Sequence, residues 1–258
     1  PELFRPQLIS ALRIIDKGYL TREEMKGAWA GELGQTQFLP TDYLKHGLDG
    51  NNDGVINLIT SKPDVLASTA KHISHYGWRK GEPWLEEVTV PAKLDWAQAN
   101  LKNMLPRSTW AKWGIKKRKG KLPADGLKAS LLLPMGKNGP AFLAYQNFRI
   151  YTEWNKSLVY ATTAAYLAAR LDGALKVSPG RGTVNTLSLA ETKRLQNILQ
   201  SKGFDVGKVD GVIGANTRAS VRKEQKRVGM AADGYPTKEL LRKLSGGSGN
   251  SGSAGLDL

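Results

Sequence analysis

The chain has 258 residues, of which 38 are Lys or Arg and 23 are Asp or Glu, so its formal net charge is +15. This length suits two domains, and a hydrophobic content of 40% is enough for a buried core. The absence of Cys excludes disulfides and thiolate chemistry, and no apolar run reaches the roughly 18 residues that a transmembrane helix needs. The chain starts at Pro1 without a signal-peptide pattern, and we expect it to begin inside a longer protein.

The excess of positive charge implies an anionic partner, which charge alone does not identify. Nucleic acid, acidic lipid and the carboxylate-bearing peptides of peptidoglycan all qualify. The densest basic run, Lys116–Lys121, is typical of either a nucleic-acid patch or a solvated loop. Binding of single-stranded nucleic acid needs aromatic side chains interleaved with basic ones, and only Trp110 and Trp113 lie near this run. We therefore expect no nucleic-acid partner.

Two helices are predicted in the first third of the chain. The first spans 6–17 and ends at Gly18. Its apolar face consists of Leu8, Ala11, Leu12 and Ile15. The second spans 61–76, with Pro63 in its first turn and Gly77 at its end. Its apolar stripe consists of Leu66, Ala70 and Ile73.

The middle of the chain predicts a hairpin followed by a helix. The apolar runs 130–133 and 141–148 are separated by a Gly- and Pro-containing turn, which favours a β-hairpin. Residues 157–171 keep helical apolar spacing, and Gly173 is placed to cap that helix. The apolar residues of its expected face are Ala164, Leu167, Ala168 and Leu171.

A change in composition at 177–186 predicts a linker, and a compact segment of three helices follows. Ser188 and Glu191 form a capping box at the start of the first helix. The second and third helices are expected at about 216–228 and 237–244, and the Gly/Ser-rich tail 246–258 is expected to be disordered.

Residues 27–40 form the most informative segment, because three glycines and a proline fix a backbone that is neither helix nor strand. Such a loop brings polar groups close to a ligand. Gln37 supplies a donor and an acceptor, and Phe38 an apolar wall, which together suit the hydroxyl edges and CH faces of a sugar. On spacing alone, a purely structural loop explains the pattern equally well.

Residues 49–57 match the first nine positions of an EF-hand calcium loop. The oxygen ligands would be Asp49, Asn51, Asp53 and Asn57. Thr60 occupies position 12, where a bidentate Glu normally completes the shell. Two interpretations remain open, a calcium site and a metal-free turn, and the Thr favours the second.

The loop at 27–40 resembles the Gly-Ser-Trp-Ala-Gly-Ala-Met-Gly-Gln-Pro-Gln-Phe-Met-Pro segment of B-type lytic murein transglycosylases. The resemblance continues through 49–58, 75–84 and Trp154-Asn155, and covers about residues 1–175. It implies a lysozyme-like α+β fold, mostly α. It also implies cleavage of peptidoglycan between N-acetylmuramic acid and N-acetylglucosamine, with a 1,6-anhydro product. The family requires no cofactor, although some members bind calcium at the EF-hand-like loop.

The same resemblance implies a substrate-binding role for five residues. Gln37 and Phe38 match residues that line the sugar subsites, and Asn155 and Tyr160 match positions near the scissile bond. Trp154 stands where the family usually has Tyr, which is consistent with stacking. Without the resemblance, packing at a helix start would explain Trp154 and Tyr160. Ala28 replaces a common Ser, and His72 stands where an aromatic wall is often found.

The general acid is the main departure from the family. Family members use one Glu in a Glu-Ser/Thr-x-aromatic-Gly motif, first as acid and then as base, whereas most glycosidases use two carboxylates. That motif does not occur in this chain. Glu32 lies in the right loop, but the family has a small residue there, and we interpret Glu32 as an exposed loop carboxylate. We expect the catalytic Glu upstream of Pro1.

The segment 187–244 resembles the small three-helix peptidoglycan-binding domain of many cell-wall enzymes. Its signature includes a tight Asp-Gly-x-x-Gly turn at 210–214, Gln225, and an Asp-Gly-Tyr-Pro run at 233–236. Glu224 departs from the family, which usually has a core aromatic residue there. A buried, unpaired Glu would be costly, so a rotated helix or a loosened domain is expected.

The sequence thus predicts a transglycosylase domain at 1–176, a linker at 177–186, a peptidoglycan-binding domain at 187–245 and a tail at 246–258. We expect a monomeric lytic transglycosylase in the bacterial periplasm or cell envelope, with glycan strands as its partner. The alternative is a non-catalytic peptidoglycan-binding protein, or an inactive fragment that lacks the acid.

Overall fold

The computed structural model describes residues 2 and 4–246, and it divides into two compact units, Pro1–Lys80 and Gly81–Leu258. Apart from Gly246, the predicted tail lies outside the described residues. No helix among the described residues is both long and apolar enough to cross a membrane.

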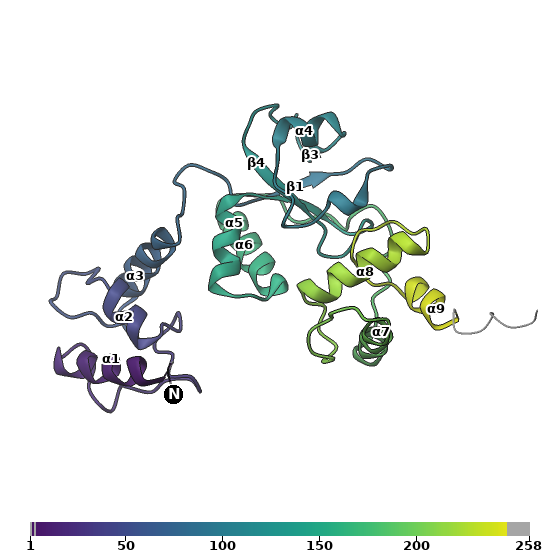
Figure 1. Ribbon diagram of the computed structural model, residues 1–258. Coiled ribbons are helices and arrows are strands. Elements are labelled where there is room, and N and C mark those ends of the chain that lie inside the picture. The colour runs from purple at the N-terminus through teal and green to yellow at the C-terminus, as the bar shows by residue number, and fades with distance from the viewer. Residues whose placement is uncertain (1, 3, 247–258) are drawn as a thin grey trace, which may run out of the picture. The chain divides into compact units, whose positions relative to one another are not determined.

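The first unit contains three helices, α1 (Phe4–Asp16), α2 (Pro40–His46) and α3 (Lys62–His75), joined by loops (Figure 1). α1 packs against α2, and α2 packs against α3. The side chain of Ser61 accepts a hydrogen bond from the amide of Asp64 and so caps α3. The two helices predicted in this region are confirmed in position.

Their predicted apolar faces are wrong. Leu8 and Leu12 of α1 are 64% and 58% exposed, and Leu66 of α3 is 70% exposed. Ile14 and Val65 are buried instead, together with polar residues that bond to neighbouring segments. Gln7, for example, donates from Nε2 to Thr41 Oγ1 at 3.0 Å and accepts from the Thr41 amide at 3.0 Å.

The second unit is built on a five-stranded antiparallel sheet of order β2-β4-β5-β1-β3. The strands are β1 (Leu85–Thr89), β2 (Leu105–Pro106), β3 (Lys116–Lys117), β4 (Lys128–Leu132) and β5 (Ala141–Ala144). β4 and β5 pair with Leu131 opposite Leu143, which confirms the predicted hairpin. The second strand is shorter than predicted because the chain turns at Tyr145 into a helix.

The two faces of the sheet bury different clusters, because successive strand residues point to opposite sides. On one face, Leu132 and Phe142 pack against α5 (Gln146–Trp154) and α6 (Leu158–Leu171). On the other face, Leu131 and Leu143 pack against Trp110 of the short helix α4 (Arg107–Lys112) and against the 3-10 turn Trp96–Gln98.

Helix α6 also buries a different face from the predicted one. Ala161 and Ala165 are fully buried, whereas Leu167 and Leu171 are 59% and 83% exposed. Ala is small enough to let the helix approach the sheet closely, and the Trp84 indole donates to the Ala165 carbonyl at 3.0 Å.

The last three helices, α7 (Leu189–Ser201), α8 (Ala215–Arg227) and α9 (Lys238–Gly246), form a separate small core. We call this part the three-helix module. The predicted capping box is present, since Ser188 and Glu191 exchange hydrogen bonds. The expectation for Glu224 is wrong. It is 2% exposed but paired, because Arg227 donates to both of its oxygens at 2.9 Å.

Two half-buried arginines attach the module to the rest of the second unit, which we call the sheet domain. Arg218 of α8 donates to the carbonyls of Leu133 and Pro134, and Arg222 donates to the carbonyl of Ala99. Burial lowers the pKa of both guanidinium groups from their ordinary value. The module and the sheet domain are therefore in direct contact.

The predicted linker is also held in place. Ser178 donates from its amide and hydroxyl to Glu87, at 3.0 and 2.5 Å. The Arg181 side chain donates to the carbonyl of Pro91 at 2.7 Å, and its guanidinium lies 4.9 Å from the ring centre of Trp96. Residues 177–186 thus run along the sheet domain, hydrogen-bonded to it.

Candidate functional site

Within the loop at 27–40, an isolated β-bridge closes a turn, and a backbone hydrogen bond joins this turn to Leu58. Leu33 and Phe38 exchange backbone hydrogen bonds of 2.7 and 2.9 Å, which close a tight turn between them. At Gly34, φ is +77°, and an added Cβ would lie 2.4 Å from the Leu58 carbonyl oxygen. Only Gly allows this approach, and it lets the Gln35 amide donate to Leu58 at 3.0 Å. The turn therefore has one defined conformation.

Gln37 and Phe38 present different faces of this turn. Gln37 is exposed, and its φ of +57° lies in the left-handed region, which is uncommon for a residue with a Cβ. Its side-chain nitrogen donates to the Gly34 carbonyl at 2.8 Å, which holds the amide against the turn. Phe38 is 3% exposed, with its ring centre 5.0 Å from that of His72. The turn thus has an exposed Gln37 followed directly by a buried Phe38.

Trp154, Asn155 and Tyr160 lie at the corner between α5 and α6, in the second unit. Asn155 ends α5, and its side-chain oxygen accepts from the Ser157 amide at 2.8 Å. The Ser157 hydroxyl then accepts from the Tyr160 amide at 3.3 Å and caps α6. These three predicted residues thus lie within one short segment of the chain, and Tyr160 is 52% exposed. The other two predicted residues, Gln37 and Phe38, are consecutive in the first unit.

Glu32 is hydrogen-bonded to other residues of the loop at 27–40. Its side chain accepts from the Ala30 amide at 3.2 Å, and its carbonyl accepts from the Ala28 amide at 2.9 Å. The side chain is half-buried, so the expectation of an exposed carboxylate is corrected. Trp29 in the same loop is 90% exposed, and no role was predicted for it from the sequence. An aromatic residue within a glycine-rich loop is the sequence signal that would have marked it.

Hydrogen bonds from amide groups of the same loop fix the conformation of the EF-hand-like loop at 49–60. Asp49 accepts from the amides of Gly54 and Asp53 at 2.8 and 3.2 Å, and these bonds, chiefly that from Gly54, lower the pKa of its carboxyl. The Asn51 amide donates to the Asp53 carboxylate at 2.8 Å. Asn57 turns its side-chain oxygen to the amides of Ile59 and Thr60 at 2.9 and 3.0 Å.

These contacts decide how well the loop would hold calcium. Asn51, Asp53, Asn57 and Thr60 line an open hollow, so most of the expected ligands share one place. Asn57, however, already accepts two amide hydrogen bonds, and Thr60 offers one neutral oxygen. The residues fit a low-affinity calcium site with two carboxylates. Asp64 was not predicted from the sequence to take part in this loop. It is fully buried and accepts hydrogen bonds from the amides of Gly50 and Asn57, both at 2.8 Å.

All three histidines of the chain gather between α2 and α3. The ring centres of His46 and His72 lie 4.5 Å apart, and those of His46 and His75 lie 4.7 Å apart. Burial, followed by the neighbouring rings, lowers the pKa of His46 to about 4, and burial also lowers the pKa of His72. Both imidazoles are therefore neutral at pH 7. These residues could not be connected from the sequence, because His46 is far from His72 and His75 along the chain.

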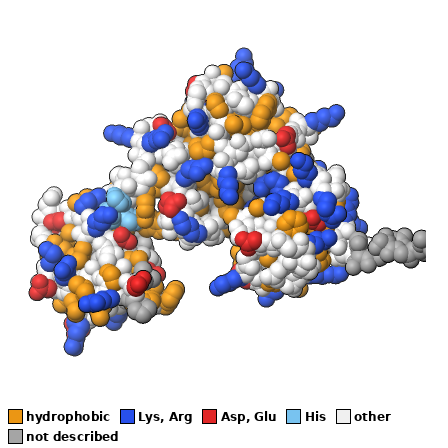
Figure 2. All heavy atoms as spheres, in the orientation of Figure 1, with side chains coloured by type: hydrophobic (Ala, Val, Ile, Leu, Met, Phe, Trp, Pro, Cys, Tyr) orange, Lys and Arg blue, Asp and Glu red, His pale blue; other side chains and the backbone are white. Residues whose placement is uncertain are grey.

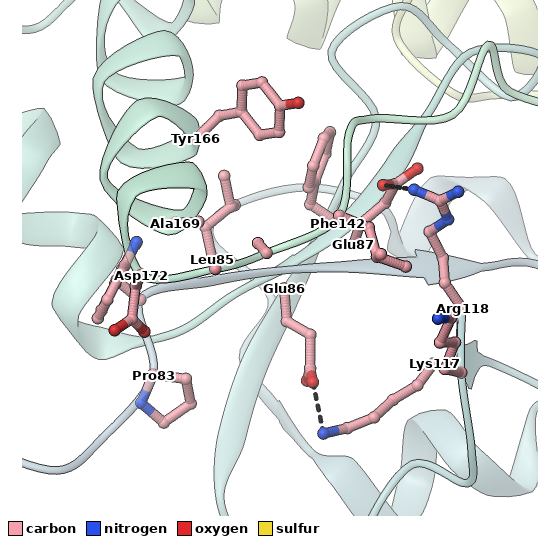
Figure 3. A pocket seen from close by; sticks show the side chains of 15 residues that line it. Pro83, Leu85, Glu86, Glu87, Lys117, Arg118, Phe142, Tyr166, Ala169 and Asp172 are labelled. Carbon is pink, nitrogen blue, oxygen red and sulfur yellow. Dashed lines mark hydrogen bonds and ion pairs between the residues drawn. The ribbon is translucent and has the colours of Figure 1, made fainter.

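A separate hollow of about 490 Å³ lies in the second unit, between β1, β3 and α6 (Figure 3). Its charged side chains are already paired, Glu86 with Lys117 at 2.6 Å and Glu87 with Arg118 at 2.8 Å. Both carboxylates thus already have cationic partners at this hollow. The pairs also show that part of the basic run Lys116–Lys121 is neutralised by β1, so the run is not simply a solvated loop.

Comparison with known proteins places this geometry in a family. Residues 1–169 match the family described as Transglycosylase SLT domain. The chain belongs to this transglycosylase family. Residues 188–244, which form the three-helix module, match the peptidoglycan binding domain. The family and the lysozyme-like, mostly helical fold class predicted from the sequence are thus confirmed.

Relatives of this transglycosylase chain extend beyond it. Membrane-bound lytic murein transglycosylase B of Escherichia coli strain K12 is 33% identical over 148 residues, which are 53% of this chain and 37% of the relative. SltB3 from Pseudomonas aeruginosa, in complex with NAG-anhNAM-pentapeptide, has a TM-score of 0.83 and 40% identity over 95% of this chain and 66% of its own. The lytic transglycosylase Slt35 of Escherichia coli, in complex with calcium, has a TM-score of 0.51 and 28% identity over 64% of this chain and 54% of its own.

Proposed function

We propose that this transglycosylase chain takes part in cleaving peptidoglycan between N-acetylmuramic acid and N-acetylglucosamine, with formation of 1,6-anhydro-muropeptides. The observation that carries the proposal is its likeness to SltB3 over 95% of the chain, because SltB3 is seen with a ligand that contains anhydro-muramic acid. A second SltB3 structure, similar over 93% of this chain, holds NAG-NAM-pentapeptide. The two ligands differ in the anhydro group that the proposed reaction would form.

The proposed glycan contacts combine polar groups with aromatic rings. Gln37 would bond sugar hydroxyls from its exposed turn, with Phe38 as the apolar support beneath it. At the α5–α6 corner, the Asn155 amide and the Tyr160 phenol would stabilise charge that develops near the scissile bond. Trp154 would stack on a sugar face. The exposure of Gln37 and Tyr160 supports these roles, since an exposed residue is accessible to a ligand.

The three-helix module would hold the enzyme on its substrate. Its family match is a peptidoglycan binding domain, and the net charge of +15 adds attraction to acidic stem peptides. Because exposed charges are screened by salt, wall binding should weaken as ionic strength rises. We propose a location in the bacterial cell envelope, specifically the periplasm, and action as a monomer.

The test is to incubate the chain with purified sacculi and to analyse both the pellet and the soluble fraction. Mass spectrometry of the soluble fraction would detect 1,6-anhydro-muropeptides. If they appear, the general acid lies within this chain, and Glu32→Gln is the first variant to test. If the protein pellets with the wall but no anhydro product forms, the chain binds without supplying the acid. Failure to pellet at low salt would overturn the binding proposal.

We also propose that the loop at 49–60 binds calcium with low affinity. Two carboxylates, Asp49 and Asp53, would supply the charge, and Slt35 is described in complex with calcium. Because affinity follows the charge count of the ligands, a dissociation constant near the weak end, about 10⁻⁴–10⁻³ M, is expected. Calorimetric titration with Ca²⁺ tests this, and an unchanged heat signal in Asp49→Asn would contradict it.

A further inference from the structure

The contact between α2 and α3 carries a second cluster of metal-ligating side chains, separate from the EF-hand-like loop. Asp42 and His46 lie four residues apart on α2, which places them on the same face of the helix. His72 reaches the same place from α3. One ligand atom from each of the three residues lies within 4.8 Å of the others. Figure 2 shows histidine side chains together at one place on the first unit.

We propose that Asp42, His46 and His72 form a binding site for a first-row transition metal, with Zn²⁺ as the expected ion. Two imidazoles and one carboxylate are a common ligand set of zinc sites that keep one position open. Imidazole nitrogens suit zinc, copper and nickel, whereas calcium and magnesium prefer oxygen. The chemistry of this site therefore differs from that of the loop at 49–60.

The geometry is close to what zinc requires. With Zn–N bonds of about 2.0–2.1 Å in a tetrahedron, ligand atoms lie about 3.3 Å apart and two bound rings have centres about 5 Å apart. The rings of His46 and His72 are 4.5 Å apart and meet edge to face, at an interplanar angle of 61°. Small side-chain rotations would bring the three ligand atoms from within 4.8 Å to coordination distance.

The backbone that carries the ligands is fixed, which favours a preformed site. The phenol of fully buried Tyr43 on α2 donates to the Ile56 carbonyl at 2.6 Å and accepts from the Leu58 amide at 3.2 Å. On α3, the Ser68 hydroxyl accepts from the Leu48 amide at 2.8 Å, just after the end of α2. These bonds fix α2 to the segment at 56–58 and fix α3 to the residues after α2, so binding a metal would order only side chains.

His75 supplies a matched control. It lies one turn beyond His72 on α3 and is exposed, and its Nε2 accepts a hydrogen bond from Lys45 Nζ at 3.3 Å. That bond occupies the nitrogen, so water is expected to fill the open coordination position. Phe38 and Tyr76 also contact the His72 ring, so a purely aromatic cluster is the competing account.

The experiment titrates the chelator-treated full chain with Zn²⁺ against a chromophoric competitor, and with Co²⁺ followed by visible absorption. One equivalent of each metal should bind, with the visible bands of four- or five-coordinate Co²⁺. His46→Gln and Asp42→Asn should each lower Zn²⁺ affinity by more than about tenfold, because even outer-shell losses cost about 10- to 100-fold. His75→Gln and Asp49→Asn should change it less than about threefold.

Two measurements keep the outcome clear if His46→Gln does not fold. Asp42→Asn changes a half-buried side chain, and its folding can be checked by circular dichroism. In the unchanged chain, Co²⁺ should shift the ring resonances of His46 and His72 more than those of His75. Absence of stoichiometric binding, or equal losses in His75→Gln and His46→Gln, would overturn the proposal in favour of an aromatic cluster.

Discussion

The Lys137 amide donates a hydrogen bond of 2.8 Å to the carboxylate of Asp233, which joins the β4–β5 turn to the three-helix module. The other oxygen of Asp233 accepts from the side chain of Gln225 on α8 at 2.7 Å. The Asp-Gly-Tyr-Pro run that resembles a family signature therefore also holds the module against the sheet domain. Several of the buried contacts between the two parts converge on α8.

Arg218→Ala should separate the unfolding of the module from that of the sheet domain. The variant loses two charged hydrogen bonds to buried carbonyls, each worth about 1.5–3 kcal/mol. Calorimetry should show one transition more than in the unchanged chain, and the segment 177–186 should be cleaved faster by trypsin. Arg194→Ala, on an exposed face of α7, is the control. An unchanged number of transitions in Arg218→Ala would contradict this account.

Gly34→Ala should destabilise the first unit more than Gly31→Ala does. Both glycines have positive φ, so each Ala variant incurs backbone strain of about 1 kcal/mol. Only at Gly34 would the new Cβ meet the Leu58 carbonyl, at 2.4 Å, while Gly31 has open space. Urea unfolding measures the difference in free energy of unfolding, which we expect to exceed about 1 kcal/mol. Equal losses would show that the turn can shift.

Gln37→Gly should keep or raise stability while it weakens glycan binding. The left-handed conformation at Gln37 costs a residue with a Cβ about 1 kcal/mol, which Gly avoids. The proposed sugar contact is lost at the same time. Asn52→Gly is the matched control, because Asn52 has a φ of +61° in a different loop. Calorimetry and a sacculus pull-down should show similar stability in the two variants and weaker binding only in Gln37→Gly.

The module should lose stability as the pH falls below about 4.5, partly through Glu191. The Ser188 amide bonds to this carboxylate and lowers its pKa below the ordinary 4.5. A carboxyl with a depressed folded-state pKa stabilises the fold above its unfolded value, and that contribution disappears as pH drops through the folded value. Glu191→Gln should show a smaller fall between pH 5 and about pH 3 in thermal unfolding. An identical pH profile would exclude the contribution.

Helix positions could be predicted from the sequence because short local signals set them. Ser188 caps the helix that it was predicted to begin, and Ser61 and Ser157, which were not named from the sequence, cap two others. Helix faces could not be predicted, since they depend on what each helix packs against. Leu171 fits an apolar stripe in sequence, yet it is exposed, because the sheet accepts the small residues Ala161 and Ala165.

The candidate site residues likewise fall into those that could be predicted from the sequence and those that could not. A resemblance over consecutive residues pointed to Gln37 and Phe38, but the histidine cluster joins two helices and is visible only in three dimensions. The spacing of Asp42 and His46 was the one local signal for it. The pairing of Glu224 with Arg227 was likewise open to prediction, because the two residues are three apart on a helix.

The hydrogen bonds that fix residues 177–186 have a consequence for how such an enzyme would work along a glycan strand. A flexible tether lets a catalytic part reach many bonds around its anchor, with a local concentration set by tether length. Here Ser178 and Arg181 hold the connection against the sheet domain, so the module and the α5–α6 corner keep a constant separation. Once the module is attached, the glycan bond that meets this corner would be set by a fixed distance along the wall. The spacing of cleavage products would then record the dimensions of the protein.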